Sequence, residues 1–191
     1  MPTHELHPHE REHFATLAPG ETMVIVRAIV CSEGEPFNLS DFKGYHVLDD
    51  GSIDAWWGDS KLNGRVRFHP PLRPGQRYGV GEEWVIGGPK SGIGTRYVLY
   101  RRDSDGSDTF VDWQPASTLP DWAARDHFTV VKVEGKSLRQ VPLGVFEKIT
   151  PSNWDVGVLI NFERWWNHHN PDMPFESNPW AWVCEIRKEG E

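Results

Sequence analysis

The chain has 191 residues, of which 28 are acidic and 20 basic, so its formal net charge is −8. This length fits a single domain that buries its own core, and a composition with 38% hydrophobic and 12% aromatic residues argues against disorder along the whole chain. The net charge argues against a protein that coats duplex nucleic acid, because such proteins draw their affinity from Lys and Arg on phosphates. An aromatic pocket that holds one base remains compatible with this charge, because stacking dominates there.

The sequence shows no membrane-spanning run, no secretory signal and no disulfide framework. No apolar run approaches the ~18 residues that a membrane span needs, and the first residues lack the basic and apolar regions of a secretory signal. Cys31 and Cys184 are too few for a disulfide framework and are expected to be reduced thiols. We therefore expect a cytoplasmic protein with no membrane partner.

The first twenty residues form a polar segment with four histidines, which we separate from a single domain at 21–191. A helix is expected from Pro8 to Leu17. His9 and His13 are spaced to share one helix face and so invite a metal interpretation, but a solvated terminal segment is the simpler expectation. No C-x-x-C or H-E-x-x-H pattern is present, and we predict neither a metal site nor a cofactor.

Strand signals fill most of the remaining chain. Short runs rich in β-branched and aromatic residues are separated by Gly, Pro and Asp, with Asp49-Asp50-Gly51 as the turn of a hairpin. Strands are expected at residues 23–31, 45–48, 53–57, 65–68, 77–86, 96–101, 128–134 and 180–187. In the last of these, Trp180, Trp182, Cys184 and Ile186 share one face.

The sequence predicts one main helix between residues 151 and 171. Apolar residues recur there every four positions, which is typical of an amphipathic helix: Trp154, Val158, Phe162 and Trp166. Many short strands with one main C-terminal helix predict a mostly β (α+β) fold, a compact β-barrel with helical insertions.

Three segments in order resemble one family, the ASCH domains, in their phage and prophage form. They are PGQRYGVGEEW at 74–84, LPDWAARDHFTV at 119–130, and FERWWN at 162–167 followed by SNPWAWVCEI at 177–186. The resemblance implies a PUA-like β-barrel that binds RNA or a modified base in a cleft beside the barrel. It also implies an alternative, because some small ASCH proteins are metal-independent hydrolases, either acetylcytidine amidohydrolases or ribonucleases.

The chain departs from the family pattern after its first strand. The family's Lys-Thr turn should follow residues 27–30, where this sequence has Cys31-Ser32-Glu33-Gly34 instead. Glu82 matches the family's strand glutamate, but Gly81 stands where the family has an arginine. Lys43 is the remaining candidate for the missing cation.

The leading hypothesis is recognition of RNA or a modified nucleobase. Glu82 would meet a base edge or a water molecule, and Arg125 would meet a phosphate. Eight arginines fall within residues 65–125 and are expected to form one basic face. The predicted nucleic-acid-binding residues are Trp57, Arg77, Trp84, Trp122 and Arg125, with Trp84 and Trp122 flanking the cleft.

Two rival functions remain open. A hydrolase would use Glu82 as general base and Lys43 as nucleophile. A phage interaction module would instead use the tryptophan-rich ending and the acidic surface to contact a phage or host protein.

Overall fold

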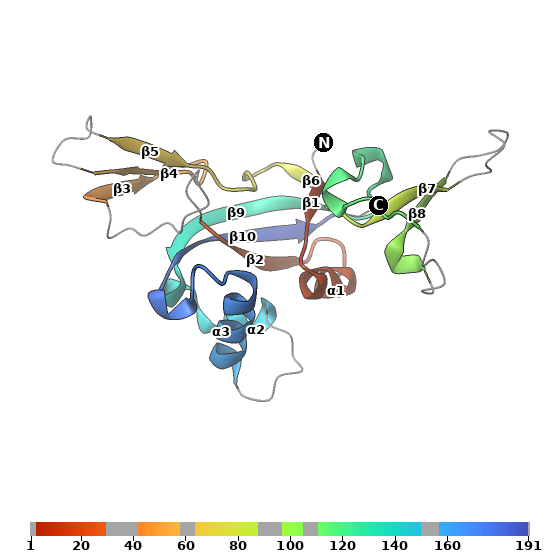
Figure 1. Ribbon diagram of the computed structural model, residues 1–191. Helices are drawn as coiled ribbons and strands as arrows, with labels where there is room; N and C mark the ends of the chain where they lie inside the picture. Colours follow the sequence, from red (N-terminus) through yellow and green to blue (C-terminus); the bar gives the residue numbers. More distant parts are fainter. Residues whose placement is uncertain are drawn as a thin grey trace.

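The strands of the chain form open sheets, as seen in the computed structural model, which describes residues 3–29, 42–57, 64–87, 97–104, 111–149 and 157–190 (Figure 1). The described residues contain ten strands and three α-helices, so the predicted mostly β class is confirmed. They are arranged in sheets of five, three and two strands. The predicted barrel is not seen, because the sheets of the described residues do not close on themselves.

The central sheet joins the two ends of the chain. Its order is β1 (Thr3–Glu5), β6 (Arg77–Gly81), β9 (His127–Ser137), β10 (Trp180–Lys188) and β2 (Thr22–Ala28). β1 runs parallel to β6, and the other neighbours are antiparallel. The C-terminal strand therefore lies inside the sheet, paired on both sides.

The alternation predicted for the last strand is confirmed. Trp180, Trp182, Cys184 and Ile186 lie in the larger core cluster, and the intervening Ala181 and Val183 lie in a second cluster. Because successive strand residues point to opposite faces, β10 supplies side chains to both. The second cluster is completed by α2 (Leu143–Ile149) and α3 (Val158–His169).

The two smaller sheets extend from opposite ends of the central sheet (Figure 1). One contains β3 (Gly44–Val47), β4 (Ile53–Trp56) and β5 (Arg65–Phe68), and it includes the predicted hairpin. The other pairs β7 (Trp84–Gly87) with β8 (Tyr97–Tyr100).

Residues 77–86, predicted as one strand broken by glycines, form two strands that belong to different sheets. The chain leaves the central sheet after Gly81 and enters the two-stranded sheet at Trp84. The break falls at Glu82, whose buried carboxylate is bonded to arginine side chains. This break positions the candidate site.

The N-terminal helix α1 (Pro8–Thr16) is confirmed, but its surroundings differ from the expected solvated segment. Leu6 and Phe14 are fully buried in the larger core. Glu10 is also buried and forms a two-pronged ion pair with Arg27. Burial would raise the pKa of Glu10, but the hydrogen bonds and charge of Arg27 lower it below its usual value.

The helix predicted at 151–171 is seen as α3, with Phe162, Trp165 and Trp166 buried on its inner face. Trp154 lies outside the described residues. The short α2 was not predicted, because its seven residues span too few turns to show a periodic stripe. None of the described helices is long and apolar enough to cross a membrane.

Candidate functional site: a cleft beside Glu82

Glu82 lies at the point where the chain passes from β6 to β7, and it is only 3% exposed. Its Oε2 accepts hydrogen bonds from Nε and Nη2 of Arg125, at 3.0 and 2.9 Å. Its Oε1 lies 3.5 Å from Nη1 of Arg102. A buried carboxylate needs such partners, because an unpaired charge away from water is costly.

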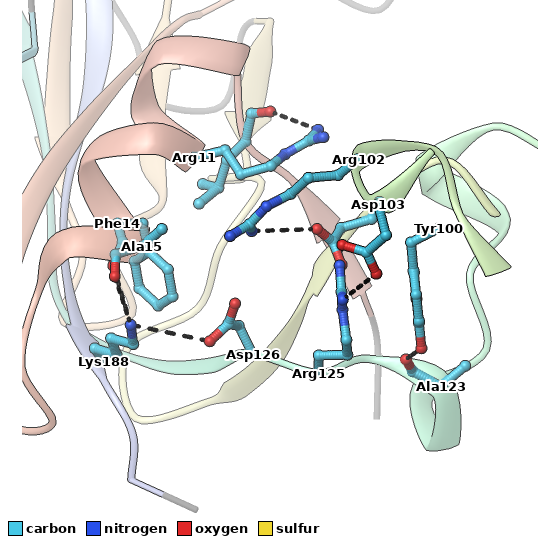
Figure 2. A network of polar contacts seen from close by, with 12 residues as sticks. Arg11, Phe14, Ala15, Tyr100, Arg102, Asp103, Ala123, Arg125, Asp126 and Lys188 are labelled. Atoms are coloured by element: carbon cyan, nitrogen blue, oxygen red, sulfur yellow. Dashed lines mark hydrogen bonds and ion pairs between the residues drawn. The ribbon is translucent and has the colours of Figure 1, made fainter. Parts of the chain in front are cut away.

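Arg125 is the centre of this polar network (Figure 2). Its Nη1 donates to Asp103 at 2.6 Å, and its guanidinium lies 4.0 Å from the centre of the Tyr100 ring. The Tyr100 hydroxyl donates to the carbonyl of Ala123. Burial would lower the pKa of Arg125, but Glu82 and Asp103 raise it above its usual value. The guanidinium is thus held in place as a cation.

A cleft of about 620 Å³ opens beside this network. Its lining includes three cations and two carboxylates, so its formal charge with neutral histidine is +1: Arg77, Arg125, Lys188, Asp126 and Glu189. His127 also lines it. The volume falls within the range of about 300–1,000 Å³ that is typical of small-ligand sites.

Helix α1 and the end of β10 meet beside the cleft. Nζ of Lys188 lies 3.3 Å from the carbonyl oxygens of both Phe14 and Ala15, and 3.9 Å from a carboxylate oxygen of Asp126. In Figure 2, Lys188 and Asp126 lie beside Phe14 and Ala15, and the Arg102 side chain extends toward them from the side of Arg125. Arg102 also lines a second cavity, of about 420 Å³, together with residues of α1. The N-terminal helix thus contributes to this region.

Three of the predicted site residues come together here. Arg77 and Arg125 line the cleft, and Arg125 holds Glu82. Trp122 is 73% exposed on the 3-10 helix Asp121–Ala123, three residues before Arg125. Nε1 of Trp84 donates to Oγ1 of Thr118. Neither tryptophan is among the described residues that line the cleft.

Lys43 and Trp57 do not join this group. They flank strands β3 and β4 of the three-stranded sheet, at the other end of the molecule (Figure 1). The backbone N–H of Lys43 donates to the carbonyl of Trp56. The structure therefore does not bring Lys43 to Glu82, as a catalytic pair would require.

The predicted single basic face is wrong. Seven of the eight arginines at 65–125 lie within the described residues, and six of these are paired with carboxylates. They are also divided between two regions. Arg65 and Arg67 lie on the three-stranded sheet, and the other paired arginines are Arg77, Arg101, Arg102 and Arg125.

Sequence reasoning missed Lys188, Arg11 and Tyr100 as components of this region. Lys188 contacts the helix at Phe14, which is 174 positions earlier in the chain. The parallel pairing of β1 with β6 anchors the N-terminal segment beside the site. No local sequence pattern could have indicated contacts across that separation.

No group of three or more potential metal-ligating side chains forms within the described part of the chain. Of the two histidines spaced to share one helix face, His13 lies on α1, and the side chain of His9 falls outside the described residues.

Comparison of the chain with known proteins finds no matching family model, no similar curated protein and no similar solved structure. The resemblance to ASCH domains therefore rests on the three sequence segments, and it stays a prediction.

Proposed function

We propose that the chain recognises RNA or a modified nucleobase in the cleft beside Glu82. The observation that carries the proposal is the convergence of Arg77, Arg125 and Lys188 on one cleft of nucleotide size in an acidic chain. Trp122 adds a largely exposed aromatic surface three residues from Arg125. The fixed cations of the cleft suit a phosphate, and Trp122, which lies outside the cleft lining, offers an exposed surface for a stacked base.

The ion pairs already present in the cleft do not prevent such a ligand from binding. Arg77 is paired with Glu189, and its side chain is about half exposed. Exposed pairs of this kind contribute only about 0–1 kcal/mol, so a phosphate can replace the carboxylate at small cost. The Arg125–Glu82 pair is more buried and would instead orient the cleft.

The geometry favours recognition over hydrolysis. Oε2 of Glu82, the candidate base, is occupied by two N–H groups of Arg125. Lys43, the candidate nucleophile, belongs to the opposite end of the molecule (Figure 1). A hydrolase would still be detected by incubating the protein with acetylated cytidine or structured RNA and separating the products.

The direct test compares two arginine variants by calorimetric titration with cytidine 5′-monophosphate at low salt. Arg77 and Arg101 each form an ion pair with a glutamate and are each about half exposed, but only Arg77 lines the cleft. Arg77→Gln should weaken binding about tenfold, and Arg101→Gln should leave it within about twofold.

Trp122 provides a second, uncharged test. Trp122→Ala should weaken binding of a short single-stranded RNA by about 1–3 kcal/mol if a base stacks on the indole. Because the Trp122 side chain is largely exposed, its removal should not disturb the fold. Equal binding by the wild type, Arg77→Gln and Trp122→Ala would refute the proposal. Absence of any nucleic-acid binding at low salt would favour the protein-interaction alternative.

A further inference from the structure

The three-stranded sheet has an outward-facing surface with its own cations and aromatic ring. On the opposite face, Ile53, Ala55 and Phe68 are buried in the larger core, whereas Tyr45 and Val47 on the edge strand are about half exposed. Because side chains alternate along each strand, the strand register places two rows of residues on the outward surface. These rows, which we call the outer sheet face, are Gly44, Trp56 and Arg65, and His46, Asp54 and Arg67.

Two arginines on the outer sheet face are held by one buried carboxylate. Asp54 is 1% exposed and accepts bonds from Nε and Nη2 of Arg67, at 2.6 and 3.0 Å, and from Nη2 of Arg65. The side chains of Arg65 and Arg67 are nevertheless 54% and 47% exposed. One carboxylate neutralises only one of them, so this trio keeps a charge of +1 in a chain of −8.

Trp56 covers the strand beside it. A Cβ atom placed on Gly44 would lie 2.5 Å from Cζ2 of Trp56, so the indole lies directly over the Gly44 backbone. The His46 ring is 5.1 Å from the indole. The indole of Trp56 is only partly buried, and Arg65 lies directly across the sheet from Trp56.

We propose that the outer sheet face binds single-stranded nucleic acid, with a base stacked on Trp56 and the backbone phosphates on Arg65 and Arg67. Guanidinium groups held in a fixed orientation suit phosphate oxygens, and the exposed part of the Trp56 indole suits an unpaired base. A phosphorylated peptide would match the arginines but would leave the indole without a role. This surface lies at the opposite end from the cleft (Figure 1), so the proposal does not depend on it.

The test measures fluorescence anisotropy of a labelled single-stranded RNA of about 12 nucleotides at about 50 mM salt. Arg65→Gln leaves Asp54 with both bonds from Arg67, so the sheet should fold. The affinity of this variant for the RNA should be lower by a factor of about five or more. The slope of its log binding constant against log salt concentration should decrease by an amount that corresponds to about one phosphate contact. Arg101→Gln, at the other end of the molecule, should bind like the wild type.

A second variant removes the ring and not the charge. Trp56→Leu should also weaken binding about fivefold, and a duplex of the same length should compete poorly because its base faces are hidden. The proposal is overturned if both variants bind like the wild type, or if the duplex competes as well as the single strand. If the wild type does not bind cytidine monophosphate but binds RNA, and Arg65→Gln loses the RNA binding, the cleft proposal is refuted and the outer sheet face is supported.

Discussion

Replacement of Glu82 by Gln tests whether the buried carboxylate organises the site. Glu82 is 3% exposed, whereas the adjacent Glu83 forms its ion pair with Arg101 at the surface. The two positions are neighbours in the chain and undergo the same chemical change. Glu83→Gln is therefore a matched control for Glu82→Gln.

The expected magnitude follows from the exposure of the partners. Loss of one member of a fully buried ion pair costs about 3–5 kcal/mol. Arg125 and Arg102 are 37% and 49% exposed, so water solvates them partly once the carboxylate is gone. We expect a loss of about 2–3 kcal/mol for Glu82→Gln, reduced from the buried-pair value, and about 0–1 kcal/mol for Glu83→Gln.

Urea denaturation measures both values, provided that the slope of the unfolding free energy against urea concentration is the same in each variant. The larger loss corresponds to a decrease of roughly 5–10 °C in Tm for a chain of this length. Arg125→Gln should cost about 1–2 kcal/mol less in the Glu82→Gln background than in the wild type, because the two groups interact directly. Equal stability of the two single variants would refute the reasoning.

Three further predictions concern other parts of the fold. Burial lowers the pKa of His4 to about 4, so the unfolded chain binds a proton that the folded chain does not between pH 6.5 and about 4. The free energy of unfolding should therefore fall by up to about 3 kcal/mol as the pH decreases through that window. If urea titrations show the same dependence of this free energy on pH in His4→Gln as in the wild type, the prediction is contradicted. Burial also raises the pKa of the Cys184 thiol to about 12, so a thiol reagent should label it only after unfolding, in a variant whose other cysteine is serine; rapid labelling of the folded protein would contradict it. Gly81→Ala should destabilise the protein, because its Cβ would lie 2.7 Å from the carbonyl oxygen of Ala116, whereas Gly144→Ala meets no atom within 4 Å and should be neutral or stabilising in thermal denaturation.

The strands were predictable where successive side chains alternate between two environments. Alternation along residues 180–187 placed four side chains in one core and two of the intervening residues, Ala181 and Val183, in the other. The hairpin around Asp49-Asp50-Gly51 followed from turn chemistry, and Gly51 has the positive φ of 82° that such a turn requires. These features follow from local patterns, because strand alternation and turn chemistry are properties of residues that are adjacent in the chain.

The open arrangement of the sheets and the location of the site were not predictable in this way. The break at Glu82 depends on Arg125, 43 positions later in the chain. The incorporation of the N-terminal segment depends on the pairing of β1 with β6 and on the buried bond between Glu10 and Arg27. The supposed basic face failed for the same reason, because composition does not reveal which carboxylate each arginine meets.

The most direct test of the account is an NMR titration of the isotope-labelled full chain with cytidine 5′-monophosphate. We expect progressive shifts of the backbone amides of Asp126, His127 and Gly190, which line the cleft, and unchanged amides along α3. Those cleft amides should stop shifting in Arg77→Gln at the same nucleotide concentration. Unchanged cleft amides in the wild type, or shifts confined to another surface, would contradict the claim that this cleft recognises a nucleotide.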